Sequence, residues 1–179
     1  PYDSGDPVLI NYHLLLMKYA GIDGILIDWY GSHNILDYGS NLKNSNAIID
    51  GARRIGLQFG IVYEEFTCEE VERRKDLTDI EAAREDMRYM SDQYWNQPNY
   101  VRINNRPLLL TFGPRHFLDK GQWTTILSDI PEPIEFYPLW HHKHRVGEQN
   151  AAGEFAWVDF NEDLNELKTF YSNDRSNRI

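Results

Sequence analysis

The stretch GIDGILIDWYG, at residues 21–31, carries the clearest fold signal in this sequence. Its apolar run, residues 25–27, ends abruptly in a carboxylate and two aromatic rings. Apolar runs of this length between glycines are typical of strands buried on both faces of a parallel sheet. Ligands bind at the carboxyl ends of such strands. We therefore expect Asp28, Trp29 and Tyr30 to lie at the ligand-binding edge of a parallel sheet.

Similar apolar runs recur along the chain and alternate with helical patterns. Strands are predicted at residues 22–28, 57–63, 107–112 and 134–140, with a fifth candidate at 155–159. Helices are predicted at residues 8–20, 47–55, 116–127 and 162–171, and after the Thr78–Glu81 capping box. Residues 31–46, rich in Gly, Ser and Asn, are predicted to form a long loop.

This order of elements is that of an α/β protein. Short turns precede the predicted strands and longer loops follow them, which favours a partial or complete (β/α)8 TIM-type barrel. The alternative is an open, doubly wound parallel sheet. A complete barrel usually needs roughly 200 residues or more. We therefore expect the 179 residues to form a single barrel domain, truncated at one or both ends.

Composition and charge narrow the classes of partner. The hydrophobic fraction of 41% and charged fraction of 26% are those of an ordinary globular protein. A net charge of -10 disfavours nucleic acid and anionic membrane surfaces as partners. No apolar run is long enough to span a membrane. The unpaired edges of an incomplete parallel sheet predict self-association.

Acidic and aromatic side chains follow several predicted strands, and we expect them to converge on one mouth. The predicted substrate-binding residues are Asp28, Trp29, Tyr30, Tyr63, Glu64, Trp140 and His141. Glycoside hydrolysis typically uses two carboxyl groups, and aromatic faces stack on sugar rings. Asp28 and Glu64 are accordingly the candidates for a catalytic role. The predicted partner is an oligosaccharide or polysaccharide.

Each of these residues also has a structural alternative. Asp28 could instead accept hydrogen bonds from a neighbouring loop, and Glu64 could form a salt bridge with an arginine. Glu65 is expected to point away from Glu64, because side chains alternate in an extended chain, and to be a solvated loop acid. Trp29 and Tyr30 could wall the pocket rather than stack on a ligand. Trp157 and Asp159 follow the fifth candidate strand, and Trp157 is expected in the core.

The segment HHKH, at residues 141–144, raises a metal alternative. Imidazoles at this spacing can bind zinc or copper, and His141, His142 and Asp28 together would suit a metal-dependent hydrolase. Neighbouring side chains diverge at a strand end, however, and no third ligand accompanies them. We therefore expect His141 to donate a hydrogen bond to a sugar hydroxyl, with no metal and no other cofactor. His33, in the loop after Asp28, could reach the same site.

Four motifs together resemble the glycoside hydrolase family 99 and family 71-like group. They are DxxDP at residues 3–7, GIDGxxxDWYG at 21–31, GLxFxIxYE at 56–64 and RPL at 106–108. The resemblance implies a (β/α)8 barrel that hydrolyses O-glycosyl bonds in an α-linked polysaccharide or mannose-rich glycan, as an endo-α-mannosidase or α-glucanase. It also implies catalysis without a metal and an extracellular or periplasmic location.

The sequence departs from this family in one respect. Family 99 enzymes carry their catalytic glutamates in a Glu-Trp-x-Glu-like segment, and residues 1–179 contain none. The resemblance therefore places Asp28 and Glu64 in the substrate-binding wall. It leaves two expectations: the catalytic strand lies beyond residue 179, or the protein lacks that machinery. In the second case the chain would be a non-catalytic glycan-binding or polysaccharide-biosynthesis-associated domain.

Overall fold

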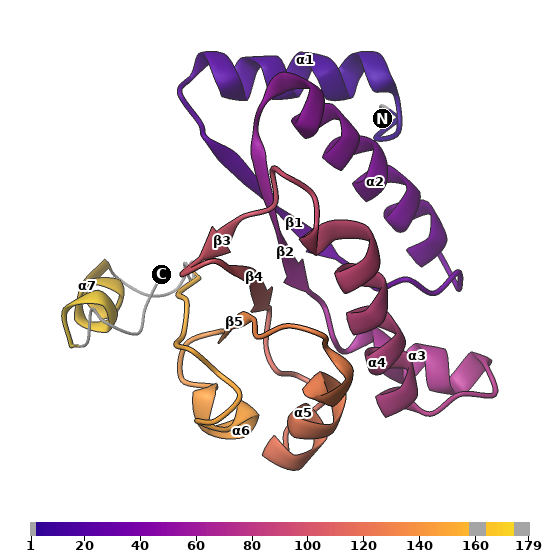
Figure 1. Ribbon diagram of the computed structural model, residues 1–179, viewed down its shortest axis with the longest axis vertical. Helices are drawn as coiled ribbons and strands as arrows, with labels where there is room; N and C mark the ends of the chain where they lie inside the picture. The colour runs from indigo at the N-terminus through magenta and orange to yellow at the C-terminus, as the bar shows by residue number, and fades with distance from the viewer. Residues whose placement is uncertain (1–2, 158–163, 174–179) are drawn as a thin grey trace.

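The computed structural model describes residues 3–157 and 164–173 and contains one mainly parallel sheet (Figure 1). Four parallel strands lie in the order β1, β2, β4, β5. Their bounds are Gly24–Trp29, Gln58–Tyr63, Arg106–Thr111 and Glu135–Pro138. The two-residue strand β3 (Arg102–Ile103) pairs antiparallel with the start of β4 in a short hairpin.

The described residues also form seven α-helices. They are α1 (Pro7–Tyr19), α2 (Tyr38–Ile55), α3 (Thr67–Arg74), α4 (Asp79–Met90), α5 (Lys120–Ile126), α6 (Lys143–Val146) and α7 (Leu164–Asn173). A π-turn (Ser91–Trp95) extends α4, and a 3-10 turn (Leu127–Asp129) extends α5. The predicted capping box is confirmed, because the Thr78 side chain accepts from the Glu81 N–H and Glu81 bonds back.

The helices that pack on the sheet lie on one face of it. The main core joins sheet residues such as Trp29 and Phe59 to Ile49 of α2, Met87 of α4 and Trp123 of α5. In Figure 1, α2, α4 and α5 follow one another around this outer side.

The opposite face carries a separate apolar cluster that contains no residue of these helices. Its buried members are Val62, Leu108, Leu110, Tyr137 and Phe155. A doubly wound sheet would carry helices on both faces. The arrangement is therefore that of a partial TIM-type barrel whose sheet is not closed, and the doubly wound alternative is wrong.

Several predicted boundaries were wrong. α2 begins at Tyr38, so helix replaces much of the loop predicted over residues 31–46. Its first turns contain poor helix formers but bury Tyr38 and Ser45, and this packing overrides local propensity. Cys68 lies in α3, a helix that was not predicted. Of the fifth candidate strand, the structure shows one parallel bridge between Leu139 and Phe155, and residues 158–159 lie outside the described residues.

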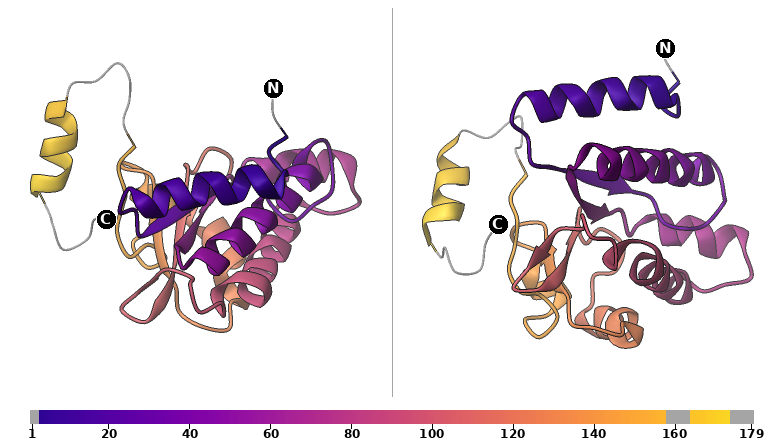
Figure 2. Two further views of the ribbon diagram at one scale, coloured as in Figure 1. Left: turned by 90° about the horizontal axis from the view of Figure 1, so that it is seen from above. Right: turned by 45° about the horizontal axis from the view of Figure 1, so that its top comes forward.

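Apolar side chains are exposed along α1 and β1. α1 lies alongside α2 at the β1 side of the sheet (Figure 2). Its outward residues include Tyr12 (58% exposed), Leu15 (56%) and Tyr19 (92%), and Leu26 of β1 is 53% exposed. On its outer edge β1 pairs with no strand among the described residues. None of the described helices combines the length and the apolarity needed to cross a membrane.

Candidate functional site

The structure brings the carboxyl groups of Asp28 and Glu64 together at the carboxyl ends of β1 and β2. The two strands are parallel, with Asp28 opposite Val62 and Trp29 opposite Tyr63. The Glu64 N–H donates to the Trp29 carbonyl oxygen at 3.0 Å, which continues the pairing one residue further. Asp28 and Glu64 therefore project from the same face, and their carboxyl groups share a hydrogen bond.

Both carboxyl groups of this pair are weaker acids than a carboxyl group free in water, although only Glu64 is buried and Asp28 is exposed. Burial raises the pKa of Glu64 to about 8, and the negative charge of Asp28 and the shared hydrogen bond add to the effect. The Arg115 guanidinium opposes it. Partial desolvation also raises the pKa of Asp28. Glu64 is only 6% exposed, and its Oε2 atom has no hydrogen-bond partner among the described residues. At neutral pH the pair consequently retains a proton and can both donate and accept.

Aromatic rings and one cation surround the pair. The Tyr30 ring lies 5.8 Å from that of Tyr38 and 6.4 Å from that of Phe66, between ring centroids. The Arg115 Cζ atom lies 4.7 Å from the Phe66 centroid. Burial raises the pKa of Tyr30, and the charges of Asp28 and Glu64 raise it further. No sequence signal marked Tyr38, Phe66 or Arg115 as site residues, because none of them lies on a predicted strand end.

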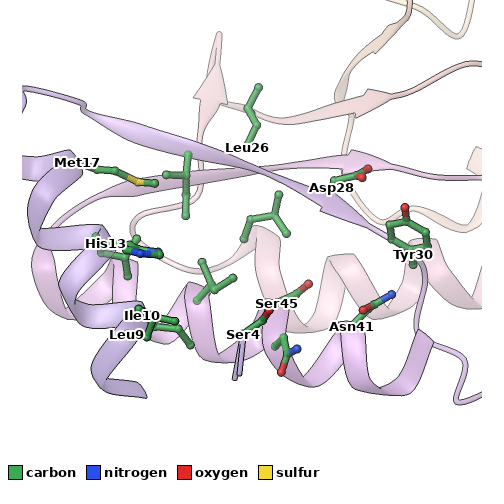
Figure 3. A pocket seen from close by; sticks show the side chains of 15 residues that line it. Ser4, Leu9, Ile10, His13, Met17, Leu26, Asp28, Tyr30, Asn41 and Ser45 are labelled. Carbon is green, nitrogen blue, oxygen red and sulfur yellow. The ribbon is translucent and has the colours of Figure 1, made fainter. Parts of the chain in front are cut away.

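A groove runs from this site along the free edge of β1. Its volume is about 590 Å³, and it lies between β1, α1 and α2 (Figure 3). Asp28, Tyr30 and Asn41 line one end, which is polar. The rest mixes apolar side chains with polar ones, among them Met17, Leu26, His13 and Ser45. The groove could hold an elongated ligand whose polar end meets the carboxyl pair.

Trp29 and Tyr63 were predicted to contact substrate, and the structure places them in the core instead. Both are 0% exposed. They alternate with Asp28 and Glu64 along their strands, so they face the helices. Trp29 stacks on Tyr89 with ring centroids 5.9 Å apart, and the Tyr63 hydroxyl donates to Asp86 Oδ2 at 2.8 Å.

Asp86 of α4 is a structural residue of the site that the sequence analysis missed. Its buried carboxylate accepts from the Ser32 N–H and the Ser32 hydroxyl, both at 2.7 Å, and so holds the loop directly after Tyr30. Gly31 permits this approach, since its φ is +92° and a Cβ there would lie 2.9 Å from Asp86 Oδ2. His33 is 5% exposed, with Nε2 3.3 Å from the Ala82 carbonyl oxygen, so it packs on α4 instead of reaching the site. An acid in the middle of an amphipathic helix gave no sequence signal for this role.

The predicted residues after β5 lie at the same edge of the sheet as the carboxyl pair, but β2 and β4 separate β5 from β1. The Trp140 ring stacks on that of His141 with centroids 5.2 Å apart, and His141 is exposed with a φ of +65°. Trp157 was expected in the core, but it is 53% exposed and packs edge-on against Phe112. Asp159 lies outside the described residues.

The predicted alternative of a metal site is not supported by the described residues. Within residues 3–157 and 164–173, no three His, Cys, Asp or Glu side chains are placed to hold a metal ion. His142 Nδ1 donates to the Pro114 carbonyl oxygen at 3.2 Å, which ties His142 to a neighbouring loop. The combination of His141, His142 and Asp28 that a metal-dependent hydrolase would need is not assembled.

Comparison with known proteins identifies the fold. The chain matches no protein-family model and no curated protein. It is similar to two structures of the GH99 endo-alpha-mannosidase from Bacteroides thetaiotaomicron. One superposes with a TM-score of 0.69 at 15% identity, covering 99% of this chain and 53% of that one. The other, in complex with bis-tris propane, gives 0.64 at 17%, covering 88% and 48%.

A glycoside hydrolase-like protein is also similar, with a TM-score of 0.64 at 11% identity, covering 94% of this chain and 56% of that one. The chain thus spans about half the length of the structures it matches. The resemblance expected from the four sequence motifs is confirmed at the level of fold. This chain has the fold of part of a glycoside hydrolase family 99 barrel.

Proposed function

We propose that this chain binds an α-linked polysaccharide or mannose-rich glycan at the Asp28–Glu64 site, as part of a glycoside hydrolase-like barrel that hydrolyses O-glycosyl bonds. The observation that supports this most directly is the carboxyl pair itself. It lies at the carboxyl ends of adjacent parallel strands, where barrel enzymes bind their ligands, and it retains a proton at neutral pH.

The chemistry of the site suits a sugar. A sugar hydroxyl both donates and accepts, and a carboxyl pair with one shared proton offers both complements. Tyr30 adds a flat apolar face beside these polar groups, on which the C–H face of a pyranose ring can rest. In this proposal Asp28 and Glu64 orient hydroxyl groups. Glu64, which keeps its proton near pH 7, is the better placed of the two to act as a general acid.

A second candidate function is glycan binding without hydrolysis. The absence of a Glu-Trp-x-Glu segment from residues 1–179 favours it. Both candidates predict a glycan at the same carboxyl pair, and they differ only in turnover.

Two measurements on one set of proteins separate these functions. Reducing-sugar release from yeast mannan and α-1,3-glucan tests hydrolysis, and calorimetric titration with an α-linked mannobiose tests binding. The variants are Asp28→Asn and Glu64→Gln, with Asp50→Asn as a matched control on the exposed face of α2. Release that both site variants abolish and the control preserves would support hydrolysis. Binding without release would support the second function, and loss of neither activity in the site variants would refute this site.

A further inference from the structure

The loop between β4 and α5 is held against the site by a buried carboxylate. Glu65 is 1% exposed, so the prediction that it would be a solvated loop acid is wrong. Its carboxylate accepts backbone N–H groups from three consecutive residues, Arg115, His116 and Phe117. The His116 N–H lies 3.1 Å from both carboxylate oxygens. One side chain thus fixes a loop fifty residues away along the chain, in the way a concave run of N–H groups holds an anion.

A side chain at Gly113 would clash with this contact. A Cβ added at Gly113 would lie 2.9 Å from Glu65 Oε1 and 2.6 Å from the Arg115 nitrogen. A second link ties the loop to the end of β5, where the Leu139 N–H donates to the Gly113 carbonyl oxygen at 2.9 Å. The backbone of Arg115 is therefore fixed from two strands.

This anchoring places the Arg115 guanidinium beside the carboxyl pair. The guanidinium lies over the Phe66 ring, with Cζ 4.7 Å from the ring centroid, and its charge acts on both Glu64 and Tyr30. The side chain forms no hydrogen bond or ion pair with another residue of the described chain. Its five N–H donors are therefore available to a ligand. Stacking on Phe66 also restricts the guanidinium before any ligand arrives, which lowers the entropic cost of binding.

The other donors of the site are few and uncharged. Glu64 keeps its proton near neutral pH, Tyr30 has one hydroxyl group, and Asn41 has one amide group. A sugar presents several hydroxyl and ring oxygens that need a donor.

We infer that Arg115 is the principal hydrogen-bond donor of this site toward the oxygen atoms of the glycan, and that Glu65 is the positioning residue that holds Arg115 there. The inference rests on the proposed glycan ligand for the donor role of Arg115, whereas the positioning role of Glu65 can be measured without ligand.

A double-mutant cycle with an α-linked mannobiose tests both parts. The variants are Arg115→Met, Glu65→Gln and the two combined, with Arg53→Met and Glu72→Gln as exposed controls. Arg115→Met should weaken binding about tenfold or more, since it removes hydrogen bonds from a charged donor. Glu65→Gln should weaken binding by a comparable factor, and the combined variant should bind no more weakly than Arg115→Met alone. Full additivity would overturn the positioning role, and unchanged binding by Arg115→Met would overturn the donor role.

Two measurements without ligand test the positioning role of Glu65 separately from the donor role of Arg115. Amide hydrogen exchange at residues 115–117 should accelerate at least about tenfold in Glu65→Gln and stay unchanged in Glu72→Gln. Carboxyl-carbon NMR should show Glu64 titrating at higher pH in Arg115→Met and at nearly wild-type pH in Arg115→Lys. The shift caused by Arg115→Met should be smaller in the Glu65→Gln background, a comparison that cancels the direct effect of the Glu65 charge on Glu64. If Glu65→Gln changes neither readout, the positioning role is wrong whether or not the variant binds sugar. If the wild-type protein binds no mannobiose while both readouts behave as expected, the glycan ligand and the donor role fail and the positioning role stands.

Discussion

Replacing Glu64 with glutamine should stabilise the protein at neutral pH. Glu64 is buried beside a second carboxyl group, and its pKa rises from 4.5 to about 8 on folding. In the unfolded chain the same carboxyl group releases its proton near pH 4.5. Between these two values the unfolded chain is ionised while the folded protein keeps its proton. The free energy of unfolding therefore falls as pH rises through this interval.

The size of the effect follows from the same two values. Each pH unit between them costs about 1.4 kcal/mol, so the penalty at pH 7 is about 3 kcal/mol. Glutamine matches the shape of glutamic acid, carries no titrating proton, and can still donate a hydrogen bond to Asp28. Glu64→Gln should therefore raise the free energy of unfolding by up to about 3 kcal/mol at pH 7 and by almost nothing at pH 4.

Urea unfolding followed by tryptophan fluorescence at pH 4, 5.5, 7 and 8.5 measures this difference. Subtracting wild type from variant removes the contributions of the other carboxyl groups. Glu72→Gln, on the exposed face of α3, is the matched control and should show no pH-dependent gain. A variant no more stable than wild type at pH 7, or a gain of equal size at every pH, would refute this account of the carboxyl pair.

Three further perturbations have defined outcomes in urea unfolding or light scattering. Gly31→Ala should lower the free energy of unfolding by at least about 1 kcal/mol more than Gly56→Ala. Both glycines have a positive φ, but only at Gly31 would a Cβ meet Asp86. Equal losses would contradict the close approach of Asp86 to Gly31. Asp86→Ala should lower the free energy of unfolding by about 3 kcal/mol or more, since it leaves the donors of Ser32 and Tyr63 without their acceptor. A loss below about 1 kcal/mol would show that other groups hold the loop after Tyr30. Concentration-dependent self-association is expected through the exposed stripe of α1 and the β1 edge. Tyr19→Lys should reduce it without loss of stability, and a monomeric wild-type protein at all concentrations would argue against it.

Local sequence signals predicted the strands well. The runs that end at Asp28 and Glu64 are apolar over most of their length, which is typical of strands in a parallel sheet, although Leu26 of β1 stays 53% exposed in this open sheet. The Thr78–Glu81 box predicted its helix for an equally local reason, since it satisfies backbone donors within one turn. α2 was predicted too short because its first turns are stabilised by packing of Tyr38, which no local pattern records.

The site residues also divide into those that local sequence signals predicted and those that depend on contacts between distant segments. Asp28, Tyr30 and Glu64 were predicted together because parallel strands bring their carboxyl ends to one edge. Trp29 and Tyr63 were assigned to it wrongly, since the sequence does not say which of two alternating faces turns toward the helices. Arg115, Glu65 and Asp86 carried no signal, because each acts on a segment far away in sequence.

The sequence by itself determined the alternation of the four parallel strands with helices, the acidic and aromatic character of the strand ends, and the likeness to a glycoside hydrolase barrel. These properties are local, since they follow from hydrophobic runs, caps and short motifs. Only the tertiary structure decided that burial and the neighbouring Asp28 raise the pKa of Glu64, that Trp29 and Tyr63 belong to the core, and that Glu65 fixes the loop of Arg115. Those properties depend on burial and on contacts between segments distant in sequence, and both arise only when the sheet and its helices assemble.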